Sequence, residues 1–245
     1  MEDLQQARSA LEAQARANIV TFIENHGWRY DLFNLKSTAN QSSDFTGEFF
    51  FCLLGGYSIT FEMNKIAFES ISSSIGFSRD SVRSPNFQED VASRLRFLTV
   101  NKDGLSRVIS YRFPNSKAKT LCSAGEWLER MDLWDLSKLL TISATDARAL
   151  LITCPGVGLK TASWFLRNIG NGDGLAIIDV HIDRIAKAWH LIPHGLDPQK
   201  NYLEIEERMQ NHCLALGTCI SKLDLALWHY SRGDLAASYN EPTSI

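Results

Sequence analysis

The segment Cys154-Pro-Gly-Val-Gly-Leu-Lys160 separates two stretches of helical periodicity, and this arrangement decides the fold. We expect one helix over residues 145–153, with a threonine as its N-cap, and a second over residues 159–169. Gly156 and Gly158 lack a Cβ atom, so the backbone between the helices can turn sharply and approach another surface closely. The sequence therefore predicts a helical hairpin.

The start of the second helix is predicted to bind a phosphate group. Its first N–H groups have no partner within the helix, and the positive end of the helix dipole lies there. Anions bind readily at such a position. We therefore predict that Gly156, Val157 and Gly158 bind a DNA phosphate, and that His181 contacts a phosphate or a base. An ordinary corner between two helices, and a histidine in the core, are the alternatives.

Lys160 and Asp179 form the candidate catalytic pair. Lys160 falls in the first turn of the second helix, where apolar neighbours and the helix dipole favour the neutral amine. Such an amine is a nucleophile and forms Schiff bases with sugar carbonyl carbons. Asp179 follows nineteen residues later and opens another helix. Its carboxylate can orient the lysine or stabilise an oxocarbenium-like sugar. A surface lysine and a plain N-cap are the alternatives.

Composition narrows the class of protein. The 245 residues carry a formal net charge of −3, and no run of 18 apolar residues predicts a membrane span. The five cysteines form no C-x-x-C, and no H-E-x-x-H motif occurs, so we predict no catalytic metal. The polar, acidic first residues are unlike a secretion signal, and we expect a cytoplasmic, DNA-associated protein.

Basic residues are concentrated in one part of the chain. Residues 79–119 hold nine Lys and Arg against four acidic residues, although the whole chain is acidic. A local basic face is sufficient for phosphate binding. An ordinary solvated helical face is the alternative.

The rest of the chain also has mainly helical periodicity, and strand-like alternation is nearly absent. We expect a helix to begin at Ser84-Pro85, with the serine as N-cap, and we expect Gly55-Gly56 to separate two earlier helices. The other expected helices cover residues 3–25, 47–54, 59–75, 115–130, 132–140, 179–190, 198–216 and 221–230. The sequence thus predicts an all-α fold.

These motifs resemble the helix-hairpin-helix DNA glycosylases that carry a catalytic lysine and aspartate. The chain is most similar to the short, archaeal-type 8-oxoguanine DNA glycosylase/AP lyases. Gly156-Val-Gly-Leu-Lys160 and Asp179-Val-His181 match their motif, and Tyr111-Arg-Phe-Pro-Asn-Ser-Lys-Ala-Lys119 resembles their entry helix. Leu223-Asp-Leu-Ala-Leu-Trp-His-Tyr230 resembles their last helix, and Phe49-Phe-Phe-Cys-Leu-Leu54 is similar more loosely.

The resemblance implies a two-lobed fold with the active site in the cleft between the lobes. It implies a glycosylase core over residues 45–232, with the hairpin at 145–169, preceded by an N-terminal helix and connector (1–44) and followed by a tail (233–245). The implied partner is double-stranded DNA with a damaged or modified base, bound by a monomer. In the implied mechanism Lys160 attacks C1′, Asp179 assists, and β-elimination then cuts the strand, with no cofactor.

The substrate is 8-oxoguanine by default, and two alternatives stay open. Tyr57, Trp164 and Trp228 are the predicted lining of the base pocket, because flipped bases stack on such rings. A place in the hydrophobic core is the alternative for these rings. The family's terminal lysine, which helps read 8-oxoguanine, has no counterpart in Glu241-Pro-Thr-Ser-Ile245. Together with Gly55-Gly56, this difference suits a phage-defence glycosylase that removes a bulky base such as glucosylated hydroxymethylcytosine. The second alternative is a non-catalytic DNA-binding module.

Overall fold

The computed structural model describes residues 45–56, 58–102, 105–215 and 217–231, together with Ala10, Ala13 and Ala17. The chain divides into two compact units, one of residues 38–171 and one of residues 1–37 with 172–245. Apart from the three alanines, the helix expected over residues 3–25 lies outside the described residues. The expected boundaries at residues 44 and 232 remain predictions.

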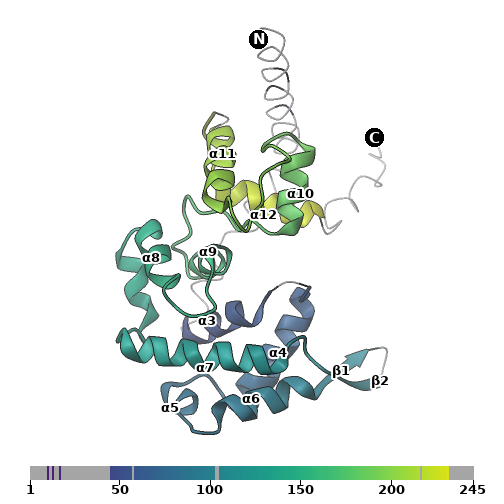
Figure 1. Ribbon diagram of the computed structural model, residues 1–245, viewed down its shortest axis with the longest axis vertical. Helices are drawn as coiled ribbons and strands as arrows, with labels where there is room; N and C mark the ends of the chain where they lie inside the picture. Colours follow the sequence, from purple (N-terminus) through teal and green to yellow (C-terminus); the bar gives the residue numbers. More distant parts are fainter. Residues whose placement is uncertain are drawn as a thin grey trace, which may run out of the picture. The chain divides into compact units, whose positions relative to one another are not determined.

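The unit of residues 38–171 consists of helices and one β-hairpin (Figure 1). Its elements, in chain order, are α3 (Phe45–Leu54), α4 (Phe61–Ser74), α5 (Arg79–Val82), α6 (Phe87–Arg96), β1 (Leu98–Lys102), β2 (Leu105–Ile109), α7 (Pro114–Arg130), the 3₁₀ helix η1 (Leu136–Thr141), α8 (Ala144–Leu151) and α9 (Leu159–Asn168). The mainly α architecture that the sequence predicted is confirmed.

Aromatic side chains form the core of this unit around α3. Phe49 is fully buried, and its ring meets Phe165 of α9 edge-on with centroids 5.2 Å apart. Trp127 of α7 lies 6.2 Å from the same ring. Burying a side chain of this size stabilises the fold by about 1.5–3 kcal/mol. Phe49 therefore ties together α7 and α9, the two helices that carry the candidate site.

The β-hairpin was not predicted from the sequence, although one short hairpin agrees with the expectation that strands are nearly absent. β1 and β2 pair antiparallel, from Leu98 opposite Ile109 to Lys102 opposite Leu105. The two residues between the strands are Asp103-Gly104. Asp-Gly is a strong hairpin signal, because both residues tolerate the positive φ angles of a type I′ turn. The helical periodicity on either side of this short segment concealed it.

Two predicted helix starts are wrong by two residues. Ser84-Pro85 forms a turn, in which Ser84 Oγ accepts a hydrogen bond from Asn86 N, and α6 begins at Phe87. Serine hydroxyls often bond locally in this way and so compete with helix initiation. The N-cap of α8 is Ser143 rather than Thr145, since Ser143 Oγ accepts a hydrogen bond from Asp146 N at 3.1 Å.

The unit of residues 1–37 and 172–245 contains α10 (Val180–Ala188), α11 (Tyr202–Ala215) and α12 (Ile220–Ser231). Their shared core consists of fully or nearly fully buried aliphatic side chains: Ile178, Ile182, Ile205, Met209, Leu223 and Leu227. Residues 170–174, before α10, form a loop. Among the helices that the structure describes, none has both the length and the apolar character needed to cross a bilayer.

Candidate active site

The helical hairpin has the predicted form. α8 and α9 are joined by a turn in which Gly156 has a φ angle of 85°, a conformation that glycine adopts without strain. A Cβ atom at Gly156 would lie 2.5 Å from Thr120 Cγ2, so the tip of the turn packs closely on α7. Val157 is buried, and its amide donates to Cys154 O within the turn.

The N-terminus of α9 is open. Gly158 is its N-cap and provides no side-chain hydrogen bond, unlike Ser143 at the start of α8. No described residue accepts a hydrogen bond from the amides of Gly158, Leu159 or Lys160. A Cβ atom at Gly158 would have no neighbour within 4 Å. These exposed amides, together with the helix dipole, can bind an anion.

Lys160 is half-buried in the first turn of α9, beside a second lysine. Lys117, in the first turn of α7, has its pKa lowered to about 8, chiefly by burial and in part by the positive charge of Lys160. Lys117 Nζ donates to Leu53 O at 2.8 Å and to Gly55 O. It thereby binds the carbonyl groups at the C-terminus of α3, where the helix dipole favours a cation.

One turn along α9 from Lys160, Trp164 lines a hollow of about 490 Å³ in the same unit. The other rings in its wall are Phe45, Phe51, Phe61 and Phe68, and Phe51 contacts Trp164 edge-on with centroids 5.6 Å apart. Glu48 contributes polar groups to this wall, since its carboxylate accepts a 2.6 Å hydrogen bond from Asn168 Nδ2. A hollow with ring walls and polar groups suits a planar, hydrogen-bonding ligand.

The side-chain space left by Gly55 and Gly56 is already filled. A Cβ atom at Gly55 would lie 2.6 Å from a ring carbon of Trp164, and one at Gly56 would lie 3.2 Å from Lys117 Nζ. The glycines therefore make room for protein side chains. The expectation that this pair widens a pocket for a bulky base loses its support.

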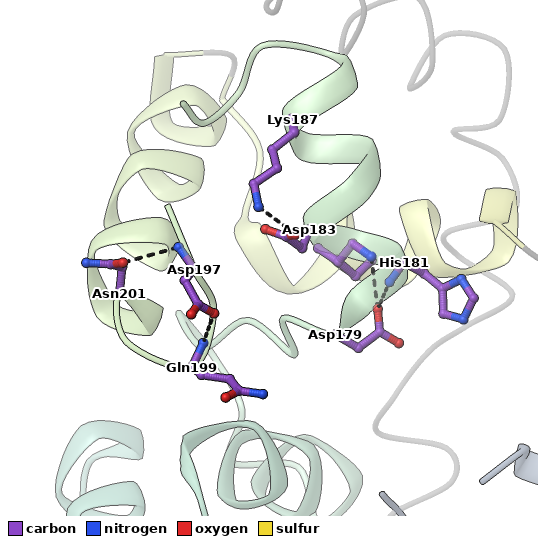
Figure 2. Close-up of polar contacts among 8 residues, drawn as sticks. Asp179, His181, Asp183, Lys187, Asp197, Gln199 and Asn201 are labelled. Atoms are coloured by element: carbon purple, nitrogen blue, oxygen red, sulfur yellow. Dashed lines mark hydrogen bonds and ion pairs between the residues drawn. The ribbon is translucent and has the colours of Figure 1, made fainter. Parts of the chain in front are cut away.

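Asp179 is the N-cap of α10, as predicted, but capping occupies only one of its oxygens. Oδ1 accepts hydrogen bonds from His181 N at 2.8 Å and from Ile182 N at 2.9 Å (Figure 2). Oδ2 accepts no hydrogen bond from any residue within the described ranges. The cap fixes the orientation of the carboxylate and leaves one oxygen available for chemistry.

The extended segment before Asp179 is held by side chains rather than by a sheet. The backbone N–H groups of three consecutive residues donate to Glu206 Oε1, Asp224 Oδ2 and Tyr202 Oη. These three side chains come from α11 and α12 and are buried. A buried amide without a partner costs about 1–3 kcal/mol, so they stabilise the conformation that presents Asp179.

The remaining predicted site residues have different positions. His181 is exposed on the first turn of α10, and its ring points away from the Asp179 carboxylate (Figure 2). Trp228 is half-buried on α12. Tyr57 lies outside the described residues. Their roles in binding a base or a phosphate remain predictions.

Lys117 and the three side chains that hold the Asp179 segment were missed by sequence reasoning. Lys117 lies within a motif that the sequence drew attention to, but nothing local indicates that its amine reaches α3, 62 and 64 residues away. Tyr202, Glu206 and Asp224 resemble ordinary helix residues. Their partners lie 24, 30 and 47 residues earlier in the chain.

Comparison with known proteins adds independent evidence. A family model described as 8-oxoguanine DNA glycosylase matches residues 27–218. The 8-oxoguanine DNA glycosylase/AP lyase of Metallosphaera sedula is 34% identical over 126 residues, which are 51% of this chain and 61% of that protein. The protein of the same name in Fusobacterium nucleatum is 34% identical over 128 residues, or 50% and 58% of the two chains. The match thus spans about 60% of these relatives' length.

Solved structures give the same result for the fold. The crystal structure of the 8-oxoguanine DNA glycosylase of Thermotoga maritima superposes with a TM-score of 0.59, at 27% identity, over 95% of this chain and 98% of that one. The Methanocaldococcus jannaschii 8-oxoguanine glycosylase/lyase, solved with a 15mer DNA containing 8-oxoguanine, gives a TM-score of 0.57 at 26% identity. That superposition covers 89% and 90% of the two chains.

Proposed function

Since this chain belongs to the 8-oxoguanine DNA glycosylase family, we propose that it excises 8-oxoguanine from double-stranded DNA and then cuts the strand. The observation that carries the proposal is the hydrogen bonding of the Asp179 carboxylate. Its Oδ1 caps α10, whereas Oδ2 has no partner among the described residues. The carboxylate can therefore hold the start of α10 with one oxygen and act on a substrate with the other.

In the proposed first step, the target nucleotide is flipped out of the duplex and its C1′ faces Lys160. The neutral amine attacks C1′, and the bond from C1′ to the base breaks with its electron pair leaving on the base, which takes up a proton. Asp179 stabilises the positive charge that develops on the sugar. A charged group held where the opposite charge develops in the transition state contributes several kcal/mol to such a step in other enzymes.

In the second step, Lys160 acts as the anchor for strand cleavage. The amine loses a proton, the bond from C1′ to O4′ breaks, and the opened sugar forms a protonated Schiff base with Lys160. Removal of a C2′ proton then sends an electron pair toward the iminium and expels the 3′ phosphate. Water finally releases the lysine. Asp179 is the proposed acceptor of the C2′ proton.

The open amides of α9 have a role in this scheme. They lie directly before Lys160, and they are the proposed site of a backbone phosphate next to the flipped nucleotide. The sugar next to that phosphate would then lie beside Lys160, at the same end of α9. The close packing of Gly156 on Thr120 supports a rigid turn at this point.

Borohydride trapping tests the proposal. A duplex with one 8-oxoguanine should give a covalent protein–DNA adduct with the wild-type protein and none with Lys160→Ala, while binding to an abasic-analogue duplex is retained. Lys138→Ala removes an exposed lysine that is bonded only to the backbone of Asp132, and it should trap like the wild type. An adduct of full yield with Lys160→Ala would contradict the proposed nucleophile.

The same assay separates the alternatives. Duplexes with 8-oxoguanine and with glucosylated hydroxymethylcytosine are compared at equal concentration, and excision of only the second would favour a phage-defence glycosylase. A protein that binds all duplexes and excises no base would be a DNA-binding module. No structural observation favours the bulky base, since Trp164 and Lys117 fill the space beside the two glycines.

A further inference from the structure

The β1–β2 hairpin exposes apolar side chains on a free-standing ribbon. Val108 is 65% exposed and Leu105 is 59% exposed, and Phe97, just before β1, is 66% exposed. A two-stranded hairpin without a covering layer is only marginally stable in water. Because successive side chains of a strand point to opposite faces, Leu105 lies on one face of the ribbon and Val108 on the other. Exposed apolar groups of this kind often mark a surface for a partner.

The base of the hairpin is nevertheless firmly attached. Leu98, at the start of β1, is fully buried, and Tyr111, just after β2, is 2% exposed. The amide of Tyr111 donates to Leu95 O at 2.7 Å, and its hydroxyl donates to Leu54 O at 2.9 Å. The hairpin therefore projects from a fixed base, as Figure 1 shows at the end of α6.

The charge of this region indicates the chemistry of the partner. Residues 94–119 contain seven Lys and Arg and one acidic residue, Asp103, in a chain with a net charge of −3. Arg107 is exposed on β2 opposite Val100, and it has no ion-pair partner among the residues that the structure describes. Such a surface fits a polyanion, and an acidic protein or a duplex would both supply one.

Continuity with the candidate site favours the duplex. β2 leads into the N-terminus of α7, where the guanidinium of Arg112 lies 4.8 Å from the ring centroid of the exposed Phe113. One turn further along α7, Lys117 is close enough to Lys160 for the charge of Lys160 to lower the pKa of Lys117. Thr120 of α7 packs on Gly156, in the turn between α8 and α9. The β-hairpin, the first turns of α7 and the start of α9 thus follow one another within a single compact unit.

We propose that the β1–β2 hairpin is a DNA-binding arm, which contacts the duplex beside the target nucleotide through Arg107 and Leu105 on one face of the ribbon and Val108 on the other. This inference rests on the proposed action on DNA. A two-stranded ribbon fits the major groove, which is about 12 Å wide. Arg107 binds a phosphate, and the exposed aliphatic groups contact sugars and the methyl groups of thymine.

Equilibrium binding to an abasic-analogue duplex tests the arm. Arg107→Ala should weaken binding to a 30-base-pair duplex about three- to tenfold and lower the slope of log Kd against log salt by about 1. The loss should disappear on a duplex shortened until it ends beside the analogue. Arg83→Ala is the matched control, because Arg83 is also an exposed arginine. It lies near Glu129, which is in the last turn of α7. That turn is about 20 Å along the helix from the end that follows β2.

Each result of this binding experiment either supports or contradicts the DNA-binding arm. Unchanged DNA affinity and an unchanged salt slope for Arg107→Ala would contradict the DNA-binding arm. An acidic protein would then be the remaining partner for the hairpin. An equal loss of DNA affinity for Arg83→Ala would show that only the net charge of the protein matters, and this result would also contradict the DNA-binding arm. The proposed function fails separately, when the wild-type protein excises no base. Thermal unfolding of each variant, expected within about 2 °C of the wild type, shows that the fold is intact.

Discussion

Tyr202 Oη lies 3.1 Å from the backbone nitrogen of Ile178, the residue directly before Asp179. The same hydroxyl donates to Ala176 O at 2.7 Å, so one side chain binds the backbone on both sides of Ile177. Glu206 and Asp224 accept the two preceding amides. The conformation that presents the candidate carboxylate is thus fixed by three buried side chains, and this arrangement can be tested.

Tyr202→Phe removes both hydrogen bonds and keeps the ring. We expect the single-turnover rate of base excision to fall about tenfold or more, because small displacements of a reacting group are costly. If Tyr202 acts only through Asp179, the same change made in an Asp179→Asn background should have no further effect on the rate. Equal losses in both backgrounds would contradict a positioning role.

Tyr111→Phe provides the control for that experiment. Tyr111 is also buried, and its hydroxyl also makes two hydrogen bonds, to Leu54 O and Asn64 Oδ1. Both changes should lower the free energy of unfolding by about 1–3 kcal/mol. Only Tyr202→Phe should show a rate effect that depends on the residue at position 179.

Asp179→Asn separates capping from catalysis. The asparagine oxygen can still accept from the amides of His181 and Ile182, so the free energy of unfolding should stay within about 0.5 kcal/mol of the wild type. The negative charge is lost, and excision should slow at least about 100-fold. Asp179→Ala should lose the cap as well, for a further cost of about 1 kcal/mol by chemical denaturation. An active Asp179→Asn variant would reduce this residue to a cap.

The two hairpin glycines should respond differently to alanine. Gly158→Ala places its Cβ in open space at a φ angle of −100°, so the variant should fold normally and yet bind DNA more weakly, because the methyl group obstructs a phosphate at α9. Gly156→Ala requires a φ angle of 85° and meets Thr120, so it should lower the melting temperature. Normal DNA affinity for Gly158→Ala would contradict phosphate binding at this turn.

Lys117 gives a pH dependence with a defined sign. Its pKa is about 8 in the folded protein against an ordinary value of 10.5, because burial and the nearby Lys160 both disfavour the ammonium ion. Between pH 8 and pH 10.5 the lysine is mainly protonated in the unfolded state and mainly neutral in the folded state. The free energy of unfolding therefore rises with pH in this range, by at most about 1.4 kcal/mol per pH unit. Denaturation of wild type and Lys117→Met at pH 7.5, 9 and 10 should show this rise only in the wild type.

Local signals in the sequence predicted the parts of the site that depend on neighbouring residues. The glycine spacing predicts the turn before α9, the helical periodicity places Lys160 in its first turn, and an aspartate before an amphipathic segment predicts the cap of α10. All three features are present. Each depends on residues that are neighbours in the sequence.

Sequence reasoning failed where a competing local pattern or a distant partner decides the structure. The hairpin at Asp103-Gly104 had a usable signal that the general helical pattern concealed. Ser143 and Thr145 are both good caps, and only the position of Asp146, bonded to the Ser143 hydroxyl, distinguishes them. The use of Gly55 and Gly56 as space for Trp164 and Lys117 depends on tertiary packing alone.

The acceptor for the amide of Ile177 lies on α12, 47 residues further along the chain. During synthesis, the segment that carries Asp179 therefore leaves the ribosome well before the side chain that holds it in shape. A nascent chain already has its lysine, its hairpin turn and its aspartate, but the carboxylate has no fixed direction until the last described helix has folded. The proposed reactivity toward DNA would thus arise late, together with the completed fold.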